Sequence, residues 1–121
     1  MDNETEIIFV YNADSGLWNG YMDMLHKVVS PKTYACNLCA ITYGVFSMNK
    51  EWKSFVGKLP ARLTFLHRDE WIARYGRKDS LPAVFVKHNS TIKPWIDSDL
   101  LSRFDLQQLM QFIDANIGAI R

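Results

Sequence analysis

The sequence lacks the features that would place it in a membrane or in a specialised architecture. No apolar run approaches the roughly 20 residues that are needed to span a bilayer. The 121 residues include only 2 cysteines, which excludes a disulfide-framework miniprotein, and the 6 glycines and 4 prolines form no linker or low-complexity tract. With 14 Lys and Arg against 13 Asp and Glu, the net charge of +1 gives no general attraction to nucleic acid or to an anionic membrane. We therefore expect neither nucleic acid nor a membrane among its partners.

Familiar catalytic and ligand-binding motifs are absent as well. The chain contains no G-x-G-x-x-G, Walker A, G-x-S-x-G or H-E-x-x-H pattern. His67 and His88 have no zinc-finger spacing to the two cysteines, and we interpret each as an ordinary surface or capping residue. The sequence therefore predicts no metal site and no cofactor.

What the chain does contain is enough apolar surface for one core. Apolar residues make up 48% of its 121 residues and aromatic residues 13%, whereas two domains would each be too short to bury a core. We therefore expect a single domain over residues 1–121. The acidic start, Met1–Glu6, is the opposite of the positively charged start of a signal peptide, so we expect a cytoplasmic protein with reduced cysteines.

Short β-rich apolar runs predict the strands of a sheet. They cover residues 6–11, 62–67, 83–86 and 91–96. Pro94 makes the last run an expected edge strand, because proline cannot donate to a central ladder, and His88–Ser90 predicts the turn before it. Since helices are expected between the earlier runs, we predict an α/β protein whose sheet is mostly parallel, with an antiparallel edge at the closing hairpin.

Helical spacing of apolar residues predicts three helices before the hairpin. The first covers residues 17–29 and places its apolar side chains on one face. A short second helix follows Asn49 and carries Trp52 inward. The third begins at Asp69 and ends at Gly76, which is the residue type that most often closes a helix in the left-handed conformation.

A final helix is predicted by the most regular pattern in the chain. Ser102 and Asp105 resemble a capping box at its start. The apolar residues that follow recur at steps of three and four, which predicts one buried face made of Leu106, Leu109, Met110, Ile113 and Ile117.

The second half of the chain resembles a known family. Arg74–Gly76 followed by Leu81–Lys87 is similar to the stretch of thioredoxins that leads into their cis-proline strand, and Leu109–Ile117 resembles their last helix. The resemblance implies a thioredoxin-like fold, with a central mixed sheet of about four strands flanked by helices. It also implies that the Leu81–Pro82 peptide bond is cis and that Pro82 borders the substrate-binding site.

Cys36 and Cys39 are the residues with the most specific chemistry. Their i, i+3 spacing brings two sulfurs together where a helix begins, and the free N–H groups at a helix start favour a thiolate. In thiol–disulfide exchange Cys36 would act as the nucleophile and Cys39 as the resolving thiol, with a partner protein that carries a thiol or a disulfide. The thioredoxin pair directly follows the first strand, whereas here residues 12–17 occupy that place and contain no cysteine.

Two other interpretations of the cysteine pair stay open. Free cysteine is often buried, so the two residues would then be small apolar groups that pack a helix against the core. In that case the protein would be a non-catalytic binding or assembly module on the same fold. A metal site would need two further ligands, which the sequence does not place beside the pair.

A local excess of positive charge lies in the middle of the chain. Residues 50–79 carry eight basic side chains against four acidic ones, an excess of four positive charges. Such a run is either a solvated surface or a docking surface for an acidic partner. The substrate and the oligomeric state do not follow from the sequence.

Overall fold

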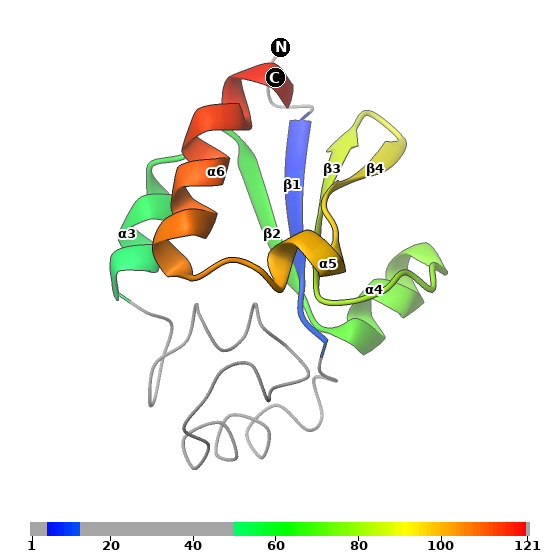
Figure 1. Ribbon diagram of the computed structural model, residues 1–121. Coiled ribbons are helices and arrows are strands. Elements are labelled where there is room, and N and C mark those ends of the chain that lie inside the picture. Colours follow the sequence, from blue (N-terminus) through cyan, green and yellow to red (C-terminus); the bar gives the residue numbers. More distant parts are fainter. Residues whose placement is uncertain (1–4, 13–49, 121) are drawn as a thin grey trace.

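The computed structural model describes residues 5–12 and 50–120, and within them four strands form one sheet with helices on both faces (Figure 1). The sheet order is β2-β1-β3-β4. The strands are β1 (Thr5–Val10), β2 (Arg62–Leu66), β3 (Ala83–His88) and β4 (Thr91–Ile96). The helices are α3 (Lys50–Gly57), α4 (Arg68–Tyr75), α5 (Ser98–Leu101) and α6 (Leu106–Ile120). The expected α/β class with a mixed sheet of about four strands flanked by helices is confirmed.

The strand directions differ from the mostly parallel sheet that the sequence predicted. Strand β1 pairs with β2 in parallel, but β1 with β3 and β3 with β4 are antiparallel pairs. The reason lies in the connection between β2 and β3. Helix α4 is only 8 residues long, and the segment after it returns to the edge where β1 ends, so that Ala83 pairs with Val10. A strand that starts beside the end of its neighbour runs antiparallel to it.

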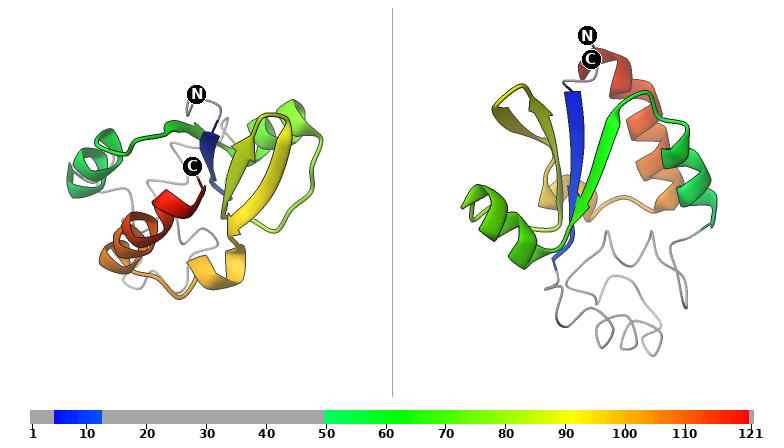
Figure 2. Two further views of the ribbon diagram at one scale, coloured as in Figure 1. Left: turned by 90° about the horizontal axis from the view of Figure 1, so that it is seen from above. Right: turned by 180° about the vertical axis from the view of Figure 1, so that it is seen from behind.

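Both faces of the central strand are covered. Side chains of β1 alternate, so that Ile7 and Phe9 join one hydrophobic cluster and Ile8 and Val10 join another. Helices α3 and α6 lie on the face of the first cluster and α4 lies on the other (Figure 2). Every residue of β1 is buried, which explains why its sequence is nearly continuous in apolar residues rather than alternating.

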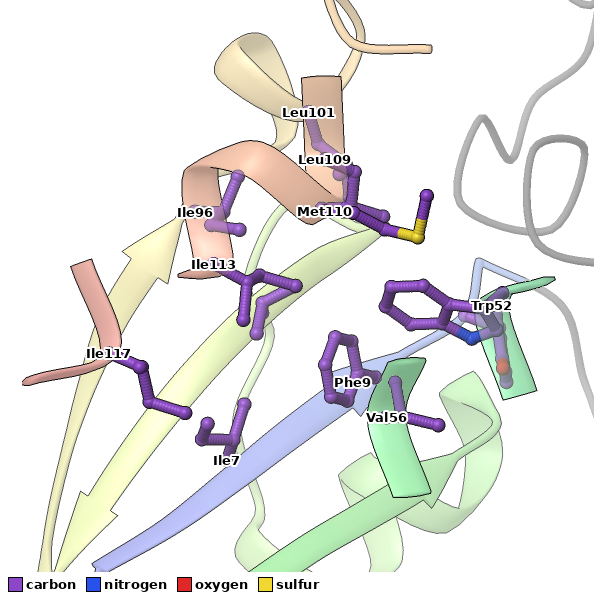
Figure 3. Packing of buried hydrophobic residues seen from close by; sticks show 12 residues of the cluster. Ile7, Phe9, Trp52, Val56, Ile96, Leu101, Leu109, Met110, Ile113 and Ile117 are labelled. Atoms are coloured by element: carbon purple, nitrogen blue, oxygen red, sulfur yellow. The ribbon is translucent and has the colours of Figure 1, made fainter. Parts of the chain in front are cut away.

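The larger cluster holds α6 and α3 against the sheet. Figure 3 shows side chains of α6 converging with those of β1, α3 and the segment before α6. The buried face of α6 contains Leu109, Met110, Ile113 and Ile117, and Leu106 packs against the same cluster while half-buried, which confirms the predicted helix face. Trp52 and Val56 are the buried residues of α3, which confirms the inward position predicted for Trp52.

The start of α6 corrects one prediction. Asp105, not Ser102, is the capping residue: its carboxylate accepts from the backbone N–H of Gln108, and the Gln108 side chain accepts from the backbone N–H of Asp105. Ser102 instead follows α5, a short helix that the sequence analysis did not predict. Asp97 caps α5 by accepting from the backbone N–H of Leu100 at 2.8 Å.

The other turns and helix ends largely follow local sequence. Gly76 ends α4 at φ 63°, where any side chain would be strained, and this confirms its predicted role. Helix α4 begins at Arg68 rather than Asp69, because His67 is its capping residue. His88 belongs to β3, so the hairpin turn is tighter than expected and consists of Asn89 and Ser90. Strand β4 lies at the edge of the sheet, as Pro94 predicted.

One carboxylate is buried within the sheet. Glu6 lies in the central strand with 8% of its surface exposed, and the Thr64 hydroxyl of the neighbouring strand donates to it. A buried carboxylate needs such a donor, because burying it without a hydrogen bond carries a large desolvation penalty that apolar contacts do not offset.

None of the helices within residues 5–12 and 50–120 is both long and apolar enough to cross a membrane.

Candidate functional site

The candidate site is the edge of the sheet where the two parallel strands end. The register pairs Val10 with Leu66 and with Ala83, so the ends of β1 and β2 and the start of β3 lie side by side. The backbone N–H of Tyr11 donates to the Leu66 carbonyl at 2.9 Å and extends this pairing by one residue. In open α/β sheets ligands collect outside the carboxyl ends of parallel strands, because backbone groups and loops converge there.

Of the predicted site residues, the structure places Pro82. It is buried at this edge, directly before the first residue of β3. The Leu81–Pro82 peptide bond is cis, which is the conformation that the resemblance implies for it. Cys36, Cys39 and the helix expected over residues 17–29 lie outside the described residues.

A pocket opens at this edge between α4 and the segment that leads to Pro82. Its volume is about 310 Å³. The lining combines apolar, polar and charged side chains. The lining residues are Asn12, Arg68, Ile72, Arg77, Lys78, Asp79 and Leu81. Three of these side chains are cationic and one is a carboxylate, so the pocket is a positive site on a protein of nearly neutral net charge.

An ion pair between Arg77 and Asp79 forms one wall of the pocket. The guanidinium donates to both carboxylate oxygens, from Nε at 3.0 Å and from Nη2 at 2.9 Å. It also lies 5.7 Å from the ring centre of Trp71 and 5.5 Å from that of Phe85, a position that favours a cation. The indole N–H of Trp71 donates to Asp79 at 3.3 Å. The wall is therefore tied to the hydrophobic cluster beneath it.

These bonds shift the pKa of both partners. The hydrogen bonds from Arg77 lower the pKa of Asp79 below its ordinary value of 3.8, although partial burial opposes the shift. The same bonds raise the pKa of Arg77. The sequence analysis did not identify this pair, but a signal was present: in extended backbone, residues two apart point to the same side, and Arg77 and Asp79 follow the end of α4 with that spacing.

Replacing Asp79 with asparagine is expected to lower the free energy of unfolding at neutral pH by about 1–2 kcal/mol, because charge-assisted bonds become neutral ones. Since the pKa of Asp79 is depressed in the folded state, the carboxylate stabilises the fold above its unfolded pKa and loses this effect as pH falls through the folded pKa. The difference between variant and parent should therefore shrink as pH falls below 3.8 and through the lowered folded-state pKa of Asp79. Urea unfolding at a series of pH values measures it.

Asp114→Asn is the control, because Asp114 is exposed on α6. A loss that is the same at every pH would contradict an electrostatic origin.

His67 and Glu70 form a second polar pair at the same edge. The Glu70 carboxylate accepts from the backbone N–H of His67 at 2.7 Å and lies 2.8 Å from its Nδ1. The backbone hydrogen bond is the largest cause of the lowered pKa of Glu70. The pair closes the first turn of α4, so His67 is a capping residue. Capping is one of the two ordinary roles that the sequence predicts for this histidine.

A second hollow lies away from this edge, between the β3–β4 hairpin and the end of α6. Its volume is about 740 Å³. Lys93, Trp95 and His88 contribute to its lining, and the His88 ring is hydrogen-bonded to the Thr5 hydroxyl at 3.1 Å. Within residues 5–12 and 50–120, no three acidic, histidine or cysteine side chains gather in a group that would hold a metal ion.

Comparison of the chain with protein families, with curated proteins and with solved structures finds no match to any of them.

Proposed function

We propose that this chain is a thioredoxin-like protein that performs thiol–disulfide exchange with a protein partner through Cys36 and Cys39. The observation that carries the proposal is the position of Pro82. It lies at the edge where β1 and β2 end, beside a pocket of about 310 Å³. This is the place that the resemblance assigns to a substrate-binding proline.

The order of the described elements supports the same proposal. After β1 come a helix, a strand, a helix, two hairpin strands and a final helix, apart from the short α5. Helix α4 packs on one face of the sheet, and α3 and α6 pack on the other (Figure 2). This arrangement resembles the thioredoxin-like fold that the sequence from Arg74 onward is similar to.

The proposed reaction is an exchange of two electrons between dithiol and disulfide. The Cys36 thiolate attacks one sulfur of a substrate disulfide, that bond breaks, and the other substrate sulfur leaves as a thiolate. The Cys39 thiolate then attacks the mixed disulfide at Cys36. The second substrate thiolate leaves, a Cys36–Cys39 disulfide forms, and the substrate is reduced. A thiol such as glutathione returns the protein to its dithiol form.

Alkylation kinetics of the reduced, folded protein test this role. Cys36 is expected to react with iodoacetamide several-fold faster than Cys39 at pH 7, because the i, i+3 spacing predicts a helix start at Cys36 and a helix start stabilises a thiolate. The pH midpoint of its rate should lie below about 8.5, the value for an unperturbed thiol. Mass spectrometry of peptides assigns the rate to each cysteine. Titration in glutathione buffers measures the potential of the pair.

A Cys39→Ser variant is the matched probe of the resolving step. With oxidised glutathione it should accumulate a mixed disulfide at Cys36, whereas Cys36→Ser should not accumulate one at Cys39. If Cys36→Ser leaves the reactivity of Cys39 unchanged, the two roles are reversed. If both thiols stay unreactive until the protein unfolds, the cysteines are packing residues and the protein is a non-catalytic binding or assembly module.

A further inference from the structure

The pocket beside α4 has an apolar side chain at its mouth. Ile72 is 42% exposed, and among residues 5–12 and 50–120 it is the large apolar side chain that stands out as exposed. Leu81 is half-buried and lines the same pocket. A single exposed apolar residue is ordinary on a protein surface, but one that continues the lining of a pocket enlarges an apolar contact area.

Positive charge surrounds this apolar contact. Arg68 and Ile72 are four residues apart, so they share one face of α4, and Lys78 approaches from the segment after the helix. The carboxylate in the lining, Asp79, is already bound at two points by Arg77. The formal charge of the lining is therefore +2, from three cations and one carboxylate.

The acidic residues of α4 do not cancel this charge at the pocket. Asp69 and Glu70 are rotated from Arg68 by about 100° and 200° around the helix axis. Neither of them lines the pocket. Glu70 is also engaged with His67. The face of α4 that borders the pocket is therefore cationic and apolar.

The size of the pocket decides what kind of ligand it fits. Sites that enclose a small molecule have volumes of about 300–1,000 Å³ and bury most of the ligand. At about 310 Å³, with Arg68, Ile72 and Lys78 exposed at its rim, this pocket is at the lower limit and open to solvent. It fits one side chain of a larger partner better than a whole metabolite.

We propose that this pocket docks an acidic segment of a partner protein, with an apolar side chain between Ile72 and Leu81 and flanking carboxylates against Arg68 and Lys78. The positive charge of the lining favours a partner segment of negative charge. The contact with Ile72 and Leu81 positions the apolar side chain of that segment in the pocket. The inference goes beyond the proposed exchange activity, because docking uses neither cysteine.

Fluorescence anisotropy with labelled peptides tests the docking surface on the whole protein. The probe is the peptide Glu-Asp-Leu-Leu-Asp-Glu, and two further peptides replace its acidic residues by lysine or its leucines by serine. The acidic leucine peptide is expected to bind at least tenfold more tightly than the lysine peptide. It should bind several-fold more tightly than the serine peptide. No probe contains cysteine, so the result is independent of the exchange activity.

Charge reversal at the rim is the decisive variant. Arg68→Glu with Lys78→Glu should weaken binding of the acidic peptide at least tenfold. Lys53→Glu with Lys58→Glu changes the net charge by the same amount but alters exposed residues in or next to α3, on the other face of the sheet, so it should stay within about threefold of the parent. Ile72→Ser should weaken binding several-fold. All of these side chains are exposed, and unfolding midpoints check that the variants fold.

Several results would overturn the proposal. One is an unchanged affinity after reversal of Arg68 and Lys78, and another is an equal loss in the Lys53 and Lys58 control. A third is equal binding of the serine peptide, which would leave no role for the apolar contact. A fourth is equally tight binding of a single-stranded oligonucleotide of matched charge, which would make the surface a general site for polyanions.

Discussion

Replacing Trp71 with alanine is expected to lower the free energy of unfolding by about 3–5 kcal/mol, the range for emptying the site of a buried tryptophan. Trp71 has no exposed surface, and its ring stacks on Phe85 with the ring centres 4.4 Å apart. It is also the buried residue of α4, a helix of only 8 residues. Helices this short depend on tertiary packing for their stability. The substitution therefore removes both a core side chain and the anchor of the helix.

Urea unfolding followed by circular dichroism measures this effect. Ile72→Ala, at the neighbouring exposed position, is the matched control and should stay within about 0.5 kcal/mol of the parent. Trp71→Phe should lie between the two, since it keeps a ring over Phe85 but loses the indole N–H that donates to Asp79. A Trp71→Ala variant as stable as the Ile72→Ala control would show that α4 is not anchored in this way.

Leu109→Ala is expected to cost about 2–5 kcal/mol, with the value set by how far the neighbouring side chains collapse into the cavity. Leu109 has no exposed surface and belongs to the cluster that joins α6 to the sheet. Figure 3 shows it beside Leu101 and Met110. Alanine is at least as favourable as leucine within a helix, so the loss reports packing rather than helix formation.

Gln111→Ala provides the control for the second substitution, because Gln111 is exposed on the same helix. The free energy of unfolding of this variant, obtained from its urea midpoint, should stay within about 0.5 kcal/mol of the parent value. An unchanged midpoint in Leu109→Ala would mean that the buried face of α6 is assigned wrongly.

Local patterns were sufficient for most of the described elements. The apolar run before Tyr11 predicts a buried strand, Pro94 predicts an edge strand, and Gly76 predicts a helix end, because each depends on the chemistry of a few neighbouring residues. Local patterns are least decisive around α5 and at the start of α6. Ser102 and Asp105 resemble a capping box, whereas Asp105 is itself the capping residue, and α5 is too short to show any periodicity.

The candidate site depended on contacts that no local pattern contains. The resemblance to thioredoxins points to Pro82, but the place of Pro82 beside the end of β1 follows from the register of β1 with β3. The pocket joins Asn12 to Leu81 and to the residues around α4, which are far apart along the chain. The sequence showed the excess of basic residues in this region, but it did not show which of them share a surface.

Within the described residues, the sequence by itself therefore determined the four strands, helices α3, α4 and α6, and the buried face of α6. Those properties depend on side-chain type and on spacings of two to four residues. Only the tertiary structure decided the direction of β3, the pairing of Arg77 with the cluster around Trp71, and the position of the cationic pocket. Each of these depends on how the chain returns to the sheet after α4, and that path is selected by packing over the whole domain rather than by any short segment.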